Sequence, residues 1–403
     1  MSQRINTLCV KDPKDPRTTT PHQLPIYATS SFEFDSIEEG IDIFKDPSKG
    51  HLYARFNNPT VDAVAQKIAH LEAHGTTDIE SPWGIMTSSG MSAISTLVFA
   101  ALQKGDKILT QGNLYGGTTE LFLKVINKTG IDTVLVNLKD ESAVRKAIEN
   151  DPSIKMIYLE TPSNPALDCI DLTMISTLAK KHGIISVVDN TFCTPLIQQP
   201  FKYGIDYIIH STTKYINGHG NSISGIIVGR DDDSKKLVWN TMKLLGTNCN
   251  PWDAWLTNNG MKTLALRMKQ HSANGQALSE FLATHPNVES VTYLGLDSHS
   301  DHVLASKQMN GFGGMMCFEV KGGYKAGLKF MNAVTIGTLA PTMGDVDTLI
   351  LHPASMSHLN VDRDIRIANG ITDGMIRVSI GIEDIYDLKE DFDSALRDGA
   401  LPF

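Results

Sequence analysis

A lysine in a loop rich in hydroxyl groups and glycine stands out in this sequence, because its amine is a potential nucleophile and base. Lys214 lies in the stretch HSTTKYINGHG, directly after a short apolar run (207–209) that predicts a buried strand. Hydroxyl groups at Ser211 and Thr213 flank it. Loops of this kind at strand ends bind phosphate through side-chain and backbone donors. We therefore expect Lys214 to lie beside a bound anion.

A carboxylate follows a second apolar run earlier in the chain. Residues 184–189 have the sequence IISVVD and end on Asp189. A buried aspartate is costly unless it meets a cationic partner. A cofactor that uses a lysine amine, a phosphate site and a carboxylate facing a ring nitrogen is pyridoxal 5′-phosphate (PLP). Taken singly, Lys214 is as easily a solvated loop lysine and Asp189 a helix cap. The combination favours PLP.

Longer stretches of the sequence resemble one known family along nearly the whole chain. The blocks that carry the resemblance are LYGGTTELF, VVDNTFCTPLIQQP, HSTTKYINGHG, HPASMSHLNV and GITDGMIRVSIGIED. They are similar to the Cys/Met-metabolism PLP enzymes, the trans-sulfuration group that includes cystathionine γ-synthase, cystathionine lyases, O-acylhomoserine sulfhydrylases and methionine γ-lyase. The resemblance implies the PLP-dependent transferase fold (fold type I, aspartate-aminotransferase-like).

The resemblance also implies roles for the residues that would contact the cofactor. Lys214 is expected to hold PLP as a Schiff base and, once the substrate amine displaces it, to act as the general base. Asp189 is expected to keep the pyridine nitrogen protonated. Tyr115 would stack on the ring and protonate the leaving group at Cγ. The further cofactor-binding candidates are Gly90 and Met91 at a helix start, Ser211, Thr213, Glu160 and Asn164.

The extended stretch HLYARFNNP is a candidate for contact between subunits. Tyr53 and Arg55 alternate to the same side of an extended segment. In the resembled family this segment reaches the neighbouring subunit and binds the phosphate of its cofactor, and a guanidinium suits phosphate well. The resemblance thus implies a homo-oligomer, with a tetramer built from dimers that share active sites.

Two residues near the C-terminus are candidates for binding the substrate. Arg377 lies in the apolar stretch MIRVS, where an unpaired arginine would be costly. In the family a substrate α-carboxylate, held bidentately, is its partner. Thr342 falls where the family often has a serine near that carboxylate, although Pro341 makes the local backbone different.

Two positions distinguish members of the family. Methionine γ-lyases usually carry cysteine where this chain has Gly117, and aspartate where it has Leu244. Both departures favour the synthase and sulfhydrylase branches. The stretches TKYINGHG and GITDGMIRVSIGIED, in contrast, look closer to the methionine γ-lyases.

We therefore predict PLP-dependent chemistry at the γ-carbon of a homoserine- or methionine-type amino acid. The favoured reaction is γ-replacement by a thiol or sulfide, as in O-acylhomoserine sulfhydrylase or cystathionine γ-synthase. The alternative is γ-elimination to 2-oxobutyrate, ammonia and a thiol, as in methionine γ-lyase. An aminotransferase on the same fold would release no free ammonia. A non-catalytic module would need no proton shuttle, and the presence of Lys214, Asp189, Tyr115 and Arg377 argues against one.

The pattern of apolar residues predicts an α/β protein in three parts. An extended, proline-punctuated arm (1–60) precedes a PLP-binding domain (61–255) with a mainly parallel, doubly wound sheet. A smaller α+β domain (256–403) follows. The expected strands are 107–110, 133–137, 156–160, 184–189, 207–210, 225–229, 289–293 and 315–320. The expected helices are 61–74, one that opens at 88–95, 252–283 with a break near 258–260, 325–334 and 388–396.

Composition argues against several other classes of protein. The net charge of -9 leaves no electrostatic footprint for nucleic acid or an anionic membrane, and no long apolar run is present, so we expect a cytosolic protein. Five scattered cysteines indicate neither a disulfide framework nor a zinc site. His219, His352 and His358 lack a closely spaced partner set, so we expect no metal.

Overall fold

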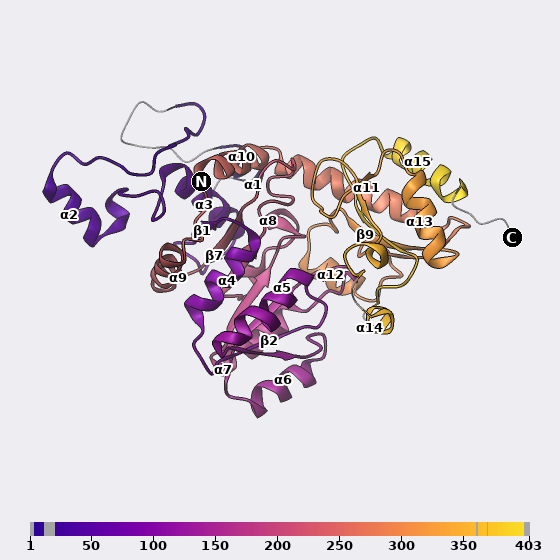
Figure 1. Ribbon diagram of the computed structural model, residues 1–403, viewed down its shortest axis with the longest axis horizontal. Helices are drawn as coiled ribbons and strands as arrows, with labels where there is room; N and C mark the ends of the chain where they lie inside the picture. Colours follow the sequence, from indigo (N-terminus) through magenta and orange to yellow (C-terminus); the bar gives the residue numbers. More distant parts are fainter. Residues whose placement is uncertain (1–3, 12–20, 360–361, 369, 399–403) are drawn as a thin grey trace.

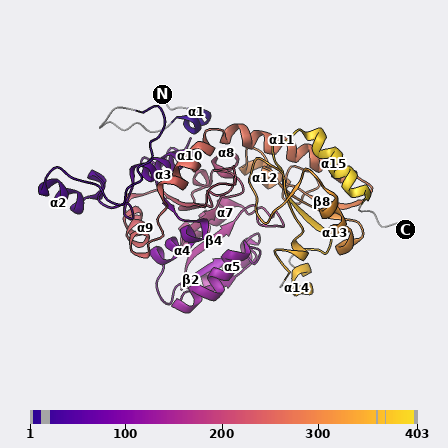
Figure 2. The ribbon, with the colours of Figure 1, turned by 45° about the horizontal axis from the view of Figure 1, so that its top comes forward.

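The computed structural model describes residues 4–11, 21–359, 362–368 and 370–398. Figure 1 shows two parts side by side, with a seven-stranded sheet at the centre of the first and a five-stranded sheet in the C-terminal part. The arm extends from the far side of the first part, and its helix α2 (Ile37–Lys45) lies away from the body in both views (Figures 1 and 2). None of the helices in these ranges combines the length and apolarity needed to cross a bilayer.

The large sheet is mainly parallel, as the sequence predicts. Its strand order is β1-β7-β6-β5-β4-β2-β3, and only the pairs that involve β7 are antiparallel. The pattern does not predict β1, which contains Gly84. A Cβ there would lie 2.4 Å from the Ala65 carbonyl oxygen, so glycine lets α3 approach the strand. The strands are β1 (Trp83–Thr87), β2 (Lys107–Thr110), β3 (Asp132–Leu135), β4 (Ile154–Glu160), β5 (Ile185–Asp189), β6 (Tyr207–His210) and β7 (Gly225–Gly229).

Apolar side chains project from both faces of this sheet and pack against helices. The strands are therefore nearly continuous apolar runs in the sequence. Ile208 packs on the side of α3 (Pro59–Glu72), whereas the next residue, Ile209, packs on the side of α4 (Gly90–Ala101) and α9 (Asp232–Leu245). The other helices of this part are α5 (Gly116–Glu120), α6 (Glu141–Asn150), α7 (Leu172–His182) and α8 (Thr194–Ile197), with short helical turns at Pro47–Lys49, Leu121–Val125, Ile126–Thr129 and Pro200–Tyr203.

The predicted long helix at 252–283 is two helices, α10 (Pro251–Met261) and α11 (Leu264–Ala283), so the break comes slightly later than expected. Helix α10 runs through Gly260, where a Cβ would lie 2.0 Å from the Asn217 carbonyl oxygen. Gly260 therefore does not end the helix. It lets the backbone of α10 approach the backbone at Asn217 closely.

The five-stranded sheet has the order β10-β11-β12-β9-β8 and is antiparallel except between β10 and β11. Side chains of α11, α13 and α15 form its core with Phe318, Ile350 and Ile376. The strands are β8 (Val288–Thr292), β9 (Met315–Val320), β10 (Thr338–Leu339), β11 (Leu349–Leu351) and β12 (Met375–Ser379). The helices are α12 (His302–Gln308), α13 (Gly323–Ala333), α14 (Arg363–Ala368) and α15 (Ile385–Asp398), with a helical turn at Pro353–Ser355.

The arm contains two short helices. Helix α1 (Ile5–Val10) lies on the body, where Cys9 is buried in the same apolar cluster as side chains of α3 and α11. Helix α2 presents Ile37, Ile41 and Phe44 on one side, at a spacing of four and three residues. These three side chains are 65%, 44% and 69% exposed. An apolar helix face without cover of this kind is typical of a surface that binds a partner.

Candidate active site

The predicted reactive residues meet at one edge of the large sheet. Strands β4 and β5 end on Glu160 and Asp189, which lie opposite each other in the parallel register. Strand β6, next along, ends at His210 and leads into the loop with Lys214. The carboxyl ends of parallel strands are the usual place for a ligand in an open α/β sheet. The topology therefore brings residues from three separate stretches into one site.

The amine of Lys214 contacts the second part of the molecule. Its Nζ donates a hydrogen bond to Thr342 Oγ1 at 2.7 Å. Arg377 Nη2, in turn, donates to the Thr342 carbonyl oxygen at 3.0 Å. Burial, together with the nearby Arg377 charge, lowers the pKa of Lys214 from its usual value. The structure thus places Thr342 between the lysine and the arginine, and the lowered pKa favours a free amine, which is the reactive form.

Arg377 is a buried cation on β12, and its hydrogen-bond partners among the described residues are neutral. Besides Thr342, its guanidinium donates to Asn164 Oδ1 at 3.3 Å, and burial lowers its pKa. No carboxylate of the described residues pairs with it in an ion pair. A buried arginine in this state is well suited to take up a carboxylate ligand.

Asp189 is surrounded by hydrogen-bond donors. Its Oδ1 accepts from the Thr191 amide at 3.0 Å and the Thr191 hydroxyl at 2.5 Å, and its Oδ2 accepts from the Tyr158 hydroxyl at 3.2 Å. Burial raises the pKa of Asp189, while the Thr191 donors, His210 and Tyr158 oppose that rise. Three donors favour the ionised form, which is the form that binds a protonated ring nitrogen.

Sequence reasoning missed Tyr158 and Thr191. Tyr158 lies two residues before Glu160 on β4, so the two side chains leave the strand on the same side. Thr191 follows Asp189 by two residues, the spacing at which an aspartate accepts from its own backbone in a turn. Both spacings are visible in the sequence, but neither identifies a functional contact without the register of the sheet.

Glu160 connects the sheet edge to Tyr115. Its Oε2 accepts a hydrogen bond from the Tyr115 amide at 2.8 Å, at the start of α5. Burial, and then the charge of Asp189, raises the pKa of Glu160 to about 8. The Tyr115 residue itself is 52% exposed.

The start of α4 forms a narrow cradle against the lysine loop. A Cβ at Gly90 would lie 2.8 Å from Ser211 Cβ, so only glycine fits. Ser89 caps the helix by accepting from the Ser92 amide, and the amides of Gly90 and Met91 lie at the positive end of the helix dipole. This is a common geometry for binding a phosphate.

The hydroxyl of Thr213, in contrast, is engaged within the loop. It donates to the Ser224 carbonyl oxygen at 3.2 Å and accepts from the Ser224 amide at 3.0 Å. Within this chain Thr213 holds the lysine loop to the segment before β7, so its contact with a phosphate stays a prediction.

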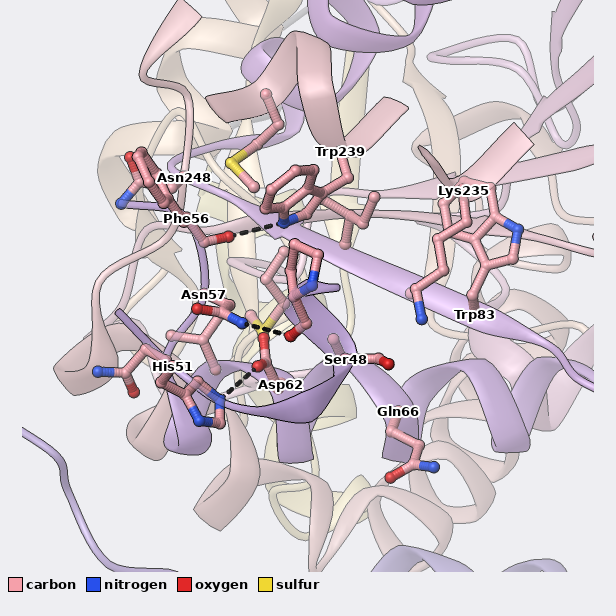
Figure 3. A pocket seen from close by; sticks show the side chains of 18 of the residues that line it. Ser48, His51, Phe56, Asn57, Asp62, Gln66, Trp83, Lys235, Trp239 and Asn248 are labelled. Carbon is pink, nitrogen blue, oxygen red and sulfur yellow. Dashed lines mark hydrogen bonds and ion pairs between the residues drawn. The ribbon is translucent and has the colours of Figure 1, made fainter. Parts of the chain in front are cut away.

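Tyr53 and Arg55 lie in a different place from the other candidates. Arg55 donates to the Lys243 carbonyl oxygen, and its guanidinium stacks over the rings of Phe56 at 5.0 Å and Tyr53 at 5.5 Å. Arg55 lines a cavity of about 1120 Å³ between the arm, α3, β1 and α9 (Figure 3). Leu244, beside Lys243, is 79% exposed. The structure therefore does not bring Tyr53, Arg55 or Leu244 to the site of Lys214 in the same chain.

The three histidines considered for metal binding have hydrogen-bond partners of their own. His219 Nδ1 lies 2.7 Å from the Asn217 carbonyl oxygen, and His352 contacts Ser355 and the Asp373 carbonyl oxygen at 2.8 Å each. His358 Nδ1 lies 2.9 Å from Ser357 Oγ. Across the described ranges, no group of three or more His, Cys, Asp or Glu residues is arranged to hold a metal ion.

Comparison with known proteins gives the family. The family described as "Cys/Met metabolism PLP-dependent enzyme" matches residues 6–397. The chain belongs to this family. It is 40% identical over 375 residues to the L-methionine gamma-lyase of Fusobacterium nucleatum subsp. polymorphum, which covers 93% of each chain. It is 37% identical to the O-succinylhomoserine sulfhydrylase of Pseudomonas aeruginosa, over 96% of this chain and 94% of that one.

Solved structures agree with this assignment. The cystathionine gamma synthase of Xanthomonas oryzae pv. oryzae, in complex with aminoacrylate and cysteine, superposes with a TM-score of 0.90 over 99% of both chains at 36% identity. The predictions of this family, of the PLP-dependent transferase fold and of an enzyme with PLP as cofactor are therefore confirmed. The prediction of PLP-dependent chemistry in sulfur amino acid metabolism is confirmed as well.

The residues at the sheet edge fit this cofactor. The cradle of Gly90 and Ser211 suits its phosphate, and the carboxyl of Asp189, held by three hydrogen-bond donors, suits its ring nitrogen. The amine of Lys214 is half-buried and makes no ion pair among the described residues. Together these groups match the three parts of PLP that a protein has to hold.

Proposed function

We propose that the chain catalyses γ-replacement on an O-acylhomoserine, with a thiol or sulfide as the acceptor. The observation that carries this choice is the space at Gly117. A Cβ there would lie 2.6 Å from Tyr115 Cε1 and 3.2 Å from its Cδ1 and Cζ. The Tyr115 ring thus occupies the volume in which the methionine γ-lyases of the family usually have a cysteine side chain. With glycine the ring lies over its own turn, and in this proposal that position of the ring admits the second substrate.

In this proposal, each residue of the site has one task. When bound, the cofactor accepts the electron pair that is left as a proton leaves Cα. Lys214 removes that proton and moves protons at Cα and Cβ, and the Thr342 hydroxyl orients its amine. Arg377 binds the substrate α-carboxylate. Tyr115 stacks on the ring and gives a proton to the leaving group at Cγ.

The remaining predicted contacts complete the cofactor site. Asp189 would hold the ring nitrogen, and Asn164, which accepts a hydrogen bond from Arg377, would line the cofactor. Gly90, Met91, Ser211 and Thr213 bind the phosphate from their own chain, while Tyr53 and Arg55 bind it from the neighbouring subunit.

Methionine γ-lyase activity is the second candidate. It is favoured by similarity, because relatives with that name are 40% and 41% identical to this chain over 92–93% of its length. It also needs the same Lys214, Tyr115 and Arg377, so the two activities differ in the fate of the substrate after the γ-substituent leaves rather than in the first steps.

The deciding experiment measures 2-oxobutyrate and ammonia from L-methionine alone, with Lys214→Ala as the control for protein-bound chemistry. Little release from methionine, together with products from O-acetyl- or O-succinylhomoserine and sulfide or cysteine, supports γ-replacement. Rapid release from methionine that is lost in the control would instead identify a γ-lyase. Keto-acid formation without free ammonia would point to an aminotransferase. Gly117→Cys serves as the matched variant and is expected to shift turnover towards elimination.

We also propose that the chain works as a homo-oligomer, with a tetramer built from dimers. The support is the exposed apolar face of α2, with Ile37, Ile41 and Phe44, on an arm that leaves the body. We propose that a second copy covers this face and that Arg55, on the same arm, reaches the neighbour's α4 cradle. Light scattering on the purified protein tests this proposal, and a fully active monomer would refute it.

The organisation of the chain and its location are proposals of the same kind. We retain an arm (1–60), a PLP-binding domain (61–255) and a C-terminal domain (256–403) in the cytoplasm. One apolar cluster joins residues on both sides of the second boundary, including Ile208 and Met268. We therefore expect the two domains to unfold together, which calorimetry would test.

A further inference from the structure

Two buried carboxyl groups lie side by side at the edge of the sheet. Glu160 and Asp189 are directly paired residues of the parallel strands β4 and β5, so their side chains leave the sheet on the same face. Neighbouring strands are about 4.8 Å apart, a distance at which two negative charges strongly oppose each other in a buried site. One of the two groups is therefore expected to keep a proton at neutral pH.

Hydrogen bonding decides which of the two carboxyls is ionised. Asp189 accepts three hydrogen bonds, two from Thr191 and one from Tyr158. Glu160 accepts one backbone hydrogen bond, from the Tyr115 amide to Oε2, and the Thr118 hydroxyl faces the same carboxyl. Its Oε1 is buried and has no hydrogen-bond partner in the described part of the chain. Donors stabilise a carboxylate, so the charge belongs on Asp189 and the proton on Glu160.

The groups that face Glu160 agree with this assignment. Asp189 on β5 is a carboxyl, and the Tyr158 phenol on β4, the Tyr115 amide and the Thr118 hydroxyl on α5 are neutral. On the other side of Asp189, the nearby His210 on β6 lowers the pKa of Asp189 and so favours its ionised form. The Lys214 amine is hydrogen-bonded to Thr342. No cation of the described residues is among the groups that shift the pKa of Glu160.

We propose that Glu160 is a positioning residue that works as the neutral acid. Its Oε2 holds the Tyr115 amide, while the proton on the other oxygen leaves Asp189 as the single negative charge that faces the cofactor ring. The buried Thr118 hydroxyl has no hydrogen-bond partner among the described residues and faces the Glu160 carboxyl, so it can accept that proton. The inference rests on the proposed roles of Tyr115 and Asp189, and it deepens them.

A first test uses the protein without cofactor or substrate. Infrared difference spectra of the apoprotein, with Glu160→Gln as the reference, are expected to show the band of a protonated carboxyl at neutral pH. That band should disappear as the pH rises through the pKa of Glu160 at about 8. A spectrum without this band at neutral pH, compared with the variant, would overturn the proposal.

The pH dependence of unfolding gives a second measurement on the apoprotein. Because the folded state keeps a proton that the unfolded chain loses, wild-type stability should fall relative to Glu160→Gln between pH 4.5 and about 8. Above that range the difference should stay constant. A difference that does not change with pH would contradict a neutral Glu160.

A matched pair of variants tests the positioning role. Glu160→Gln keeps an oxygen for the Tyr115 amide, whereas Glu160→Ala removes it. We expect the alanine variant to bind PLP at least roughly tenfold more weakly than the glutamine variant. In the pH profile of kcat/KM, the change at alkaline pH that comes from ionisation of Glu160 should be absent in Glu160→Gln. If the two variants bind PLP equally weakly, a negative charge on Glu160 is required and the proposal fails. A wild-type enzyme without turnover would refute the proposed function but leave both apoprotein tests intact.

Discussion

The Tyr158 hydroxyl offers a sharp test of how Asp189 is held. Tyr158→Phe removes one of the three donors to Asp189 and keeps the buried ring. That ring packs edge-on against Phe122, with 5.2 Å between the ring centroids. Burial and the nearby carboxylates raise the pKa of Tyr158 well above its usual value, so the phenol remains a donor throughout the working range of pH. The substitution therefore changes one hydrogen bond and little else.

The expected size of the effect follows from the geometry. A hydrogen bond to a charged acceptor contributes about 1.5–3 kcal/mol. The O···O distance of 3.2 Å is long for such a bond, which places the loss near the lower end of that range. We expect PLP to bind roughly tenfold more weakly, since 1.4 kcal/mol corresponds to a factor of about 10.

The assay is a titration of apoprotein with PLP, followed by its visible absorbance. Tyr203→Phe is the matched control, because the Tyr203 hydroxyl donates to the Lys307 carbonyl oxygen at 3.3 Å in a more exposed position. An affinity for PLP in Tyr158→Phe equal to that of the control would show that Tyr158 only packs, and the reasoning about Asp189 would be wrong.

Two further substitutions test the other ends of the site. Arg377→Lys keeps the charge but loses the bidentate hydrogen bonding to the substrate carboxylate. KM for the amino acid should therefore rise at least roughly tenfold in steady-state kinetics, with a smaller change in kcat. A changed kcat at constant KM would contradict a role in binding. Gly90→Ala places a methyl group 2.8 Å from Ser211 Cβ and should weaken PLP binding by about 1–3 kcal/mol. Gly112→Ala, where the new Cβ meets no atom within 4 Å, is the control and should bind PLP normally.

Some of the fold follows directly from local sequence patterns. The strands 107–110, 207–210, 225–229 and 315–320 are confirmed residue for residue, because each is an apolar run bounded by polar residues or glycine. The reversed direction of 225–229 depends on the connection that precedes it, which a strand pattern does not encode.

The site was predictable only where a motif was long enough to resemble a family. Lys214 and Asp189 stand out because each follows an apolar strand, and the structure brings them to one edge. Tyr158 and Thr342 act through contacts that depend on register and on the packing of two separate sheets. The pairing of Glu160 with Asp189 is likewise a property of the sheet, since the two residues are 29 positions apart in the sequence.

Arg55 contacts Lys243 at the end of α9 rather than Lys214, and this position has a genetic consequence. If each subunit lends Arg55 to its neighbour, a subunit that lacks Lys214 still donates a working arginine. A subunit that lacks Arg55 still offers a working lysine. Two alleles that are each impaired alone would then complement one another in a mixed oligomer, with half of the sites rebuilt in every mixed pair.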